Sequence, residues 1–410
     1  MNTARRTQGF RESVIRGMTR LAREYHSINL AQGFPNFAAP ELLKEAAARA
    51  IHDDINQYAI TWGAQRLREA LAKKYQEWYG LTCDPEREIT VTCGATEAMI
   101  SALLALVNPG EEVIVFEPFY ENYGPDTILA DAKPIFVPLE PGKPLDLERL
   151  ESAFSSKTRA IIVNTPSNPA GRVLTGDELG TIAELCMRYN ALAITDEIYE
   201  HIRFQGEHVP IATLPGMRER TVTISGASKT FSVTGWRVGW MVAPEELTGA
   251  IRKVHDFLTV GSPAPLQEGV ATALERLDDT FYDRLATEYR ARRDLLYQAL
   301  VTSGFRCTPP EGAYYILADF SQVDVPDSAR GLLDSDFAIW LSREIGVTPV
   351  PGSSFYPVGS DRGRQLVRFV FCKTDDILHE AARRLASITS PTSSEPRRSL
   401  GPAERSGLQR

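Results

Sequence analysis

The sequence SGASKTFSVTGWRVG, residues 225–239, places one lysine, Lys229, among small and hydroxylic residues and follows it with Arg237. Lysines usually lie on solvated surfaces beside other charges. A lysine that is partly removed from water loses part of its preference for the charged form, because burial disfavours an ammonium ion. Its neutral amine is then a nucleophile that can form a Schiff base with a carbonyl group. Taken alone, the stretch is equally compatible with an ordinary loop lysine followed by an ordinary arginine.

Seven short runs rich in β-branched residues lie on both sides of Lys229. Helical patterns such as ATEAMISALLAL (95–106) and GDELGTIAELCMRY (176–189) separate several of them. Apolar strands joined by helices indicate a mostly parallel sheet that is covered on both faces and binds ligands at the carboxyl ends of its strands. The runs are EITVTCG (88–94), EVIVFEP (112–118), KPIFVPL (133–139), RAIIVNTP (159–166), LAITDEI (192–198), RTVTISG (220–226) and VGWMVAP (238–244).

Candidate site residues follow the carboxyl ends of these runs. Gly94 permits a close approach, and a helix that starts at Ala95 and Thr96 offers free N–H groups and a hydroxyl to an anion. A start of this kind is common and indicates little by itself. The later strand ends add two rings that can stack on a flat ligand, an amide, an acid and a phenol: Tyr120, Tyr123, Asn168, Asp196 and Tyr199.

Composition argues against several classes of protein. The chain has 410 residues, 43% hydrophobic and 24% charged, a mix typical of a globular protein long enough for two domains. A net charge of -8 argues against nucleic acid as the main partner, because phosphate backbones require a basic surface. The first 25 residues carry arginines without a continuous apolar stretch. We therefore expect no signal peptide, no membrane anchor and a cytoplasmic location.

Cysteine and histidine usage argues against a metal site. The five cysteines are scattered and never arranged as CxxC, and the six histidines do not cluster. This usage predicts reduced, mostly buried thiols and no bound metal.

Taken together, the motifs resemble the pyridoxal-phosphate enzymes of fold type I, specifically the class I/II aminotransferases. The most similar branch contains kynurenine, glutamine and bacterial methionine aminotransferases. The resemblance covers about residues 10–386 and implies an α/β fold with a large domain, built on a mostly parallel seven-stranded sheet, and a smaller α+β domain. It rests on INLAQGFP (28–35), NQYAITWG (56–63), TCGATEA (92–98), EPFYENY (117–123), NTPSNPAG (164–171), DEIYEH (196–201), residues 225–239 and LVRF (366–369), which occur in the family's order.

The resemblance implies a division of the chain into four parts. Residues 1–44 contribute to the small domain and the substrate site. Residues 45–290 form the large domain that binds pyridoxal 5'-phosphate, and residues 291–386 form the C-terminal small domain. The stretch 387–410 is poor in apolar residues and is expected to be a disordered tail.

The resemblance also implies how the cofactor is held. Lys229 forms a Schiff base with the cofactor and moves the proton at the substrate α-carbon, while Asp196 pairs with the pyridine nitrogen. Asn168 and Tyr199 donate hydrogen bonds to the ring oxygen, and Tyr120 stacks on the ring. The phosphate ligands are Arg237, the backbone at Gly94, Ala95 and Thr96, Ser228, and Tyr58 of the partner subunit in a homodimer. Gly226 stands where many relatives have a serine or threonine phosphate ligand.

The substrate site follows from the same resemblance. Arg368 binds the α-carboxylate through two parallel hydrogen bonds, although alternation alone would read it as a charge facing water from an edge strand. Gly33 adds a backbone N–H contact, although the turn around it reads locally as a plain glycine turn. The pocket is expected to be apolar and aromatic, with no second arginine for a distal carboxylate. Its candidates are Ile15, Phe34, Tyr58, Trp62, Tyr123, Asn168, Phe355 and the loop HDFLTVGSPAP (255–265) of the neighbouring subunit.

These residues predict an aminotransferase that moves the amino group of a neutral, medium-to-large or aromatic L-amino acid to a 2-oxo acid by a ping-pong mechanism. Two alternatives within the same fold stay open, a carbon–sulfur β-lyase and a specialised synthase. A third, more remote alternative is a non-catalytic regulator that binds the cofactor. Residues 1–30 are too short for the helix-turn-helix that such regulators carry.

Overall fold

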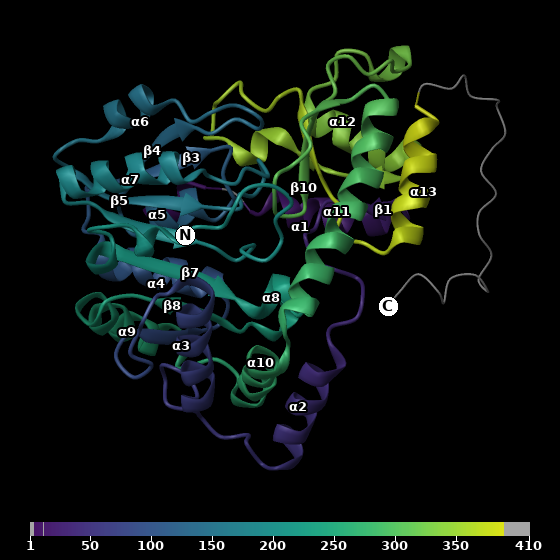
Figure 1. Cartoon of the computed structure of the whole chain (residues 1–410). Helices are drawn as coiled ribbons and strands as arrows, with labels where there is room; N and C mark the ends of the chain where they lie inside the picture. Colours follow the sequence, from purple (N-terminus) through teal and green to yellow (C-terminus); the bar gives the residue numbers. More distant parts are fainter. Residues whose placement is uncertain (1–3, 11, 389–410) are drawn as a thin grey trace.

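The computed structural model of the chain describes residues 4–10 and 12–388, and a seven-stranded sheet forms its centre (Figure 1). Only β8 runs antiparallel to its neighbours, so the predicted mostly parallel sheet is confirmed. Each of the seven β-branched runs contains one strand. In sheet order these are β2 (Ile89–Thr92), β8 (Gly239–Val242), β7 (Thr221–Gly226), β6 (Leu192–Asp196), β5 (Thr158–Asn164), β3 (Glu112–Glu117) and β4 (Lys133–Pro138).

Helices cover both faces of this sheet. Because successive strand residues point to opposite faces, Ala160 and Ile162 of β5 pack with one helical layer, and Ile161 and Val163 pack with the other. The first layer contains α4 (Ala95–Leu106), α5 (Tyr123–Leu129) and α9 (Glu245–Thr259). The second contains α6 (Leu147–Ala153) and α7 (Gly176–Tyr189). A third cluster, at β2 and β8, contains α2 (Glu41–His52), α3 (Gln65–Tyr79), α8 (Ala227–Thr230) and α10 (Ala264–Arg276).

A smaller α+β region is built from the two ends of the described chain. Its four-stranded sheet has the order β12 (Val350–Pro351), β13 (Leu366–Val370), β10 (Tyr315–Asp319), β9 (Arg306–Cys307). A two-stranded sheet pairs β1 (Ile28–Asn29) with β11 (Val347–Thr348), so the N-terminal segment joins the core of the C-terminal region. The helices here are α1 (Val14–Glu24), α11 (Asp279–Thr302), α12 (Asp334–Trp340) and α13 (Asp375–Ala386).

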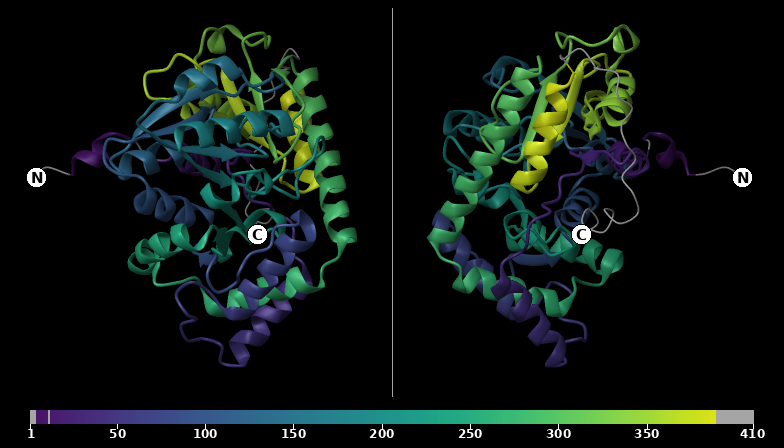
Figure 2. Two further views of the ribbon diagram at one scale, coloured as in Figure 1. Left: turned by 60° about the vertical axis from the view of Figure 1, so that its left-hand side comes forward. Right: turned by 90° about the vertical axis from the view of Figure 1, so that its right-hand side faces the viewer.

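Helix α11 is the long connection between the two regions, and it lies beside α13 along one side of the molecule (Figure 2). Short helical turns complete the structure: η1 (Arg5–Gln8), η2 (Ile211–Thr213), η3 (Arg218–Arg220), η4 (Thr234–Trp236), η5 (Asp327–Ala329), η6 (Leu341–Ile345) and η7 (Gly352–Phe355). From residue 389 on, the expected tail at 387–410 lies outside the described residues. None of the described helices is both long and apolar enough to cross a bilayer.

A buried ion pair anchors the segment that follows β6. Lys74 of α3 lies 2.7 Å from Glu200, and both side chains are almost fully buried. Ser225 at the end of β7 and Tyr79 also donate hydrogen bonds to the Glu200 carboxylate. Two elements, α3 and β7, therefore converge on one carboxylate behind the strand ends, and residues 196–201 are fixed relative to β7.

The first prediction concerns this ion pair. Lys74→Met leaves the Glu200 charge buried without its cation and is expected to lower the free energy of unfolding by about 3–5 kcal/mol, measured by urea denaturation. Lys73→Met, one residue away, removes only an exposed pair with Glu77 and is expected to cost less than about 0.5 kcal/mol. Equal losses for the two variants would contradict this assignment.

Candidate active site

A cavity of about 540 Å³ lies at the carboxyl ends of the central strands, where the large sheet meets the smaller region. It brings together residues that are more than 300 positions apart in the sequence. Of the predicted site residues, those that line it are Ile15, Gly33, Phe34, Ala95, Thr96, Tyr120, Tyr123, Asn168, Asp196, Tyr199, Ser228, Lys229, Arg237 and Arg368.

Lys229 lies in α8, the short helix that follows β7, and its side chain is partly buried at the cavity wall. Its Nζ donates a long hydrogen bond of 3.4 Å to the carbonyl of Gly33. Burial lowers the pKa of Lys229 to about 8, and the positive charges of Arg237 and Arg368 act in the same direction, while Asp196 opposes them. A substantial fraction of this amine is therefore neutral near pH 8 and available as a nucleophile.

Asp196 ends β6 and is held from two sides. The hydroxyl of Tyr123 donates to Oδ2 at 2.7 Å, and the amide of Asn164 donates to the Asp196 carbonyl at 2.8 Å. Burial raises the pKa of Asp196, whereas the Tyr123 hydrogen bond and the Lys229 charge lower it. Asn164 was not predicted as a site residue, although its place at the end of a predicted strand was the available signal. A fixed, buried carboxylate in this position can pair with a protonated ring nitrogen.

Arg368 projects from β13 and is 1% exposed. Its guanidinium donates to Asn168 Oδ1 at 2.9 Å and to the carbonyl of Ala31 at 2.7 Å. The rings of Tyr315 and Phe355 lie 4.4 Å and 4.7 Å from it. Its Nε has no hydrogen-bond partner, and within the described chain no carboxylate lies at ion-pair distance from it. A buried cation without a counter-charge is a ready site for an incoming carboxylate.

The opposite end of the cavity is suited to a phosphate. Gly94 precedes α4 with a φ of 84°, and a Cβ there would lie 2.1 Å from Nη2 of Arg237. Only glycine therefore lets the guanidinium lie against the first turn of the helix. Arg237 donates to the carbonyls of Cys93 and Thr234 at 3.2 Å and 3.0 Å. Helix N-terminal amides, the arginine and the nearby Ser228 hydroxyl together favour an anion.

Gly94, described above, and three further predicted residues do not line the cavity. Tyr58 is 88% exposed on the loop 56–63. Trp62 stacks on the Arg252 guanidinium at 4.7 Å and donates to Glu86. Phe355 is buried behind Arg368 and contacts that guanidinium.

Several lining residues were not predicted from the sequence. The hydroxyls of Tyr315 and Tyr199 lie 2.7 Å apart, and Tyr315 also packs on Arg368. Helix α1 contributes Arg16 to one wall, beside the predicted Ile15, so Arg16 is a third arginine of the lining after Arg237 and Arg368. Glu121 lies on the same wall and accepts hydrogen bonds from Ser13 and from the Ile15 amide. Only the packing of α1 against the cavity reveals these contacts.

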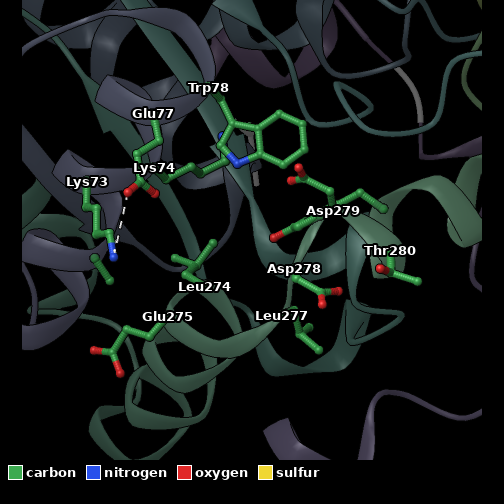
Figure 3. Close-up of a pocket in the computed structure, with 12 residues that line it drawn as sticks. Lys73, Lys74, Glu77, Trp78, Leu274, Glu275, Leu277, Asp278, Asp279 and Thr280 are labelled. Carbon is green, nitrogen blue, oxygen red and sulfur yellow. Dashed lines mark ion pairs between the residues drawn. The ribbon is translucent and has the colours of Figure 1, made fainter.

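A second cavity, of about 450 Å³, lies between α3 and the start of α11 (Figure 3). Its Lys73 forms an ion pair with Glu77 at 3.7 Å, and Lys74 is bound to Glu200. Both amines are therefore paired with carboxylates. The remaining polar residues around it include Asp278 and Asp279, which would repel an anionic cofactor. This cavity lacks the chemistry of the first.

The first cavity fits pyridoxal 5'-phosphate. The glycine cradle at Gly94 and the Arg237 charge, which has no ion pair among the described residues, suit the phosphate. The buried Asp196 suits the ring nitrogen, and the partly neutral Lys229 suits the aldehyde. Fold and site together define an enzyme of the pyridoxal-phosphate fold type I.

Comparison with known proteins specifies the family. The family model "Aminotransferase class I and II" matches residues 25–385, so the chain belongs to this family of pyridoxal-phosphate-dependent aminotransferases. The solved N-succinyldiaminopimelate aminotransferase of Mycobacterium tuberculosis is 40% identical with a TM-score of 0.89, over 94% of this chain and 100% of that one. The Escherichia coli YbdL structure, titled a methionine aminotransferase, is 36% identical with a TM-score of 0.88, over 94% and 100%. A kynurenine–oxoglutarate transaminase of Dictyostelium discoideum is 37% identical over 94% of this chain and 96% of its own length.

The second prediction follows from the lowered pKa of Lys229. The neutral amine captures the cofactor aldehyde, so the rate at which cofactor-free protein takes up pyridoxal 5'-phosphate should rise with pH and level off above a midpoint near pH 8. Stopped-flow absorbance measures this rate, and Lys229→Ala is the control without covalent capture. A midpoint near 10.5, the ordinary value for lysine, would contradict the assignment.

Proposed function

We propose that this aminotransferase moves the amino group of a neutral, medium-to-large or aromatic L-amino acid to a 2-oxo acid, by a ping-pong sequence in the cavity around Lys229. One observation carries the proposal: the partly neutral amine of Lys229 and the unpaired buried guanidinium of Arg368 line the same cavity. An α-amino acid that places its carboxylate on Arg368 can present its α-carbon to Lys229.

The proposed cofactor contacts use the two ends of the cavity. Pyridoxal 5'-phosphate, when bound, supplies an aldehyde that accepts the amino group and a ring that withdraws electrons from the substrate α-carbon. Asp196 would hold the ring nitrogen in its protonated form. Asn168 would donate its amide N–H to the ring oxygen, because Arg368 already occupies the Asn168 carbonyl oxygen. Tyr199 would donate to the same ring oxygen, and Tyr120 would stack on the ring.

The phosphate contacts and the proton transfer are also proposals. Arg237, Ser228 and the backbone at Gly94, Ala95 and Thr96 would bind the phosphate. Lys229 would remove the proton from the substrate α-carbon as a base and return a proton as an acid on the way back. Its lowered pKa supports both directions near neutral to slightly alkaline pH, because the free energies of the two protonation states are then similar.

Substrate choice would depend on the wall formed by α1. Ile15 and Phe34 offer apolar surface, which suits side chains such as those of methionine or kynurenine, the substrates in the names of two relatives. Arg16 and Glu121 add one positive and one negative charge to the same wall. A neutral substrate side chain would leave both groups charged, and this costs little free energy because the two charges partly compensate each other. Arg16 also supports a second candidate, a substrate whose far end carries a carboxylate, as in N-succinyldiaminopimelate.

A homodimer is the proposed assembly. Residues 55–63 and 255–265 expose large apolar side chains, which soluble monomers rarely gather in one place: Ile55, Tyr58, Ile60, Phe257, Leu258 and Val260. His255 joins the two loops, since its Nε2 lies 2.7 Å from the carbonyl of Thr61. Burial of these loops against a second copy would let Tyr58 reach the partner's phosphate site, and Trp62 and loop 255–265 approach the partner's substrate.

We also propose domain boundaries and a cellular location for the chain. The shared core of α1, β1 and the C-terminal elements supports the assignment of 1–44 to the small domain with 291–386, and the sheet supports 45–290 as the large domain. The proposed boundary at 290/291 falls inside α11. Five unpaired cysteines support the cytoplasm, where thiols stay reduced.

The third prediction tests the carboxylate site. Arg368→Ala should raise the amino acid concentration needed for half-maximal conversion of the bound cofactor by about 10²–10³-fold, because one partner of a buried charge pair is lost. Cofactor content should not change. Arg364→Ala, an exposed arginine of the same region, is the control. Unchanged substrate affinity in Arg368→Ala would contradict the proposal.

The same assay resolves the substrate class. Methionine, glutamine, phenylalanine and kynurenine should react faster than aspartate and glutamate. With excess 2-oxoglutarate present, each turnover should form one glutamate. A substrate that carries a sulfur leaving group on its β-carbon, such as cystathionine, distinguishes the alternative, because release of a thiol, pyruvate and ammonia from it would indicate β-elimination. If N-succinyldiaminopimelate reacts fastest and Arg16→Gln removes that preference while sparing methionine, the second candidate replaces the first.

The fourth prediction tests the shared site. Tyr58→Ala and Lys229→Ala subunits should each be inactive or weak alone. Mixed dimers should regain activity, because Tyr58 of the Lys229→Ala chain completes the site that retains Lys229. Subunits are mixed by unfolding and refolding together, and activity is measured against each variant refolded alone. An absence of complementation, with dimers demonstrated by ultracentrifugation, would reject the contribution of Tyr58 to the partner.

A further inference from the structure

Lys373 is a second buried cation near the cavity, and neither the proposed cofactor contacts nor the proposed substrate contacts use it. It lies just beyond the end of β13 and is 4% exposed. Its Nζ donates to the carbonyl of Phe34 at 2.8 Å and, more weakly, to that of Gln32 at 3.4 Å. The same Nζ lies 3.9 Å from the centre of the Phe34 ring. Throughout the described residues no carboxylate lies at ion-pair distance from Lys373, so its charge is met by two peptide carbonyls and a ring face.

The loop that Lys373 binds is a tight turn held from two sides. The amide of Phe34 donates to the carbonyl of Gln32 at 2.9 Å, which closes the turn around Gly33. The carbonyls of Gln32 and Phe34 face Lys373, whereas the carbonyl of Gly33 accepts from Tyr314 at 2.9 Å and from Lys229 at 3.4 Å. Loss of the Lys373 contacts would therefore free the loop on one side only.

Glycine is required at the centre of this turn. A Cβ on Gly33 would lie 2.4 Å from the hydroxyl of Tyr315, which is itself in contact with Arg368. The backbone of the turn therefore lies directly against Tyr315, at the edge of the proposed carboxylate site. Its neighbour Phe34 lines the cavity beside it.

Strand β13 and the residues after it hold the whole N-terminal segment in register. The amide of Val370 donates to the carbonyl of Leu30, and Arg368 donates to the carbonyl of Ala31 at 2.7 Å. Beyond Lys373, the amide of Thr374 donates to Asn36 at 2.8 Å. The Lys373 contacts lie between these along the N-terminal segment. They are the contacts of this series in which a charged group binds the carbonyls of the turn itself.

We propose that Lys373 is a positioning residue for the substrate carboxylate: it holds residues 32–34 so that the Gly33 amide and the Arg368 guanidinium face the same carboxylate. The inference rests on the proposed function, in which both groups bind that carboxylate. Strand β13 and the residue Lys373 beyond it then position both carboxylate-binding groups. Arg368 projects from the strand, and Gly33 is held through the Lys373 ammonium. The benefit of this arrangement is limited to substrates that carry an α-carboxylate.

The fifth prediction uses this limitation. In the holoenzyme, Lys373→Met should weaken the affinity for methionine about tenfold or more, the scale of one lost charge-assisted hydrogen bond. The rate at saturation and the absorbance of the bound cofactor should stay close to wild type. The reaction with 3-(methylthio)propylamine, which lacks the carboxylate, should be unaffected. Amide hydrogen exchange should increase in residues 32–36 alone.

Three further variants make the test decisive. Lys373→Arg keeps the cation and should retain most of the affinity, whereas Lys44→Met removes an exposed lysine and should change nothing. Lys373→Gln serves in place of the methionine variant if that protein does not fold. Equal losses for methionine and for the amine, or a fall in cofactor retention, would mean a general structural role and would overturn the proposal.

Arg368→Ala, measured in parallel, distinguishes an error about Lys373 from an error about the carboxylate site. If Arg368→Ala weakens methionine binding and Lys373→Met does not, the inference about Lys373 is wrong and the carboxylate site stands. If neither variant affects methionine binding, the carboxylate site itself is wrong.

Discussion

The site depends on positively charged side chains that are shielded from water but not fully neutralised by neighbouring negative charges. Lys229 and Arg368 line one cavity, and Arg368 contributes to the lowered pKa of Lys229 because two cations in a desolvated space repel each other. The cost of burying Arg368 is reduced by two hydrogen bonds and two ring faces, none of which cancels its charge. The cavity is thus electrostatically prepared for an anionic ligand, and in the proposed function the carboxylate and phosphate groups would relieve this unfavourable charge.

A second requirement of the proposed function is that Asp196, the acid proposed to pair with the cofactor ring, stays distinct from the acids around it. The segment after β6 carries Asp196, Glu197 and Glu200 within five residues. Each binds a different partner: Asp196 accepts from Tyr123, Glu197 lies 2.8 Å from His208, and Glu200 pairs with Lys74. Because Glu197 and Glu200 are satisfied elsewhere, only Asp196 turns towards the cavity.

Sequence alone located most of the fold and many cavity residues because those features are local. Strands of four to seven residues with β-branched side chains can be recognised from the sequence, and the residues at their ends meet at one edge of a parallel sheet. Two-residue strands such as β1 and β11 carry no pattern, so their pairing was not predicted, and the assignment of residues 1–44 to the small domain came from the resemblance alone. Arg16 and Tyr315 were missed because each reaches the cavity through tertiary packing. Asn164 was missed although it lies at the end of a predicted strand. The break between α10 and α11 at residues 277–278 also has no sequence signal, because no glycine or proline marks it.

The stretch 225–239 also carries backbone strain. Ser232 and Arg237 both adopt left-handed conformations, with φ values of 57° and 55°. Non-glycine residues in this region cost about 1 kcal/mol or more each, so glycine would be the more comfortable choice at position 237. The guanidinium beside Gly94 needs an arginine there instead. At this position folding stability and the proposed phosphate binding are in conflict: a strained backbone conformation lowers stability but places a guanidinium against the first turn of α4.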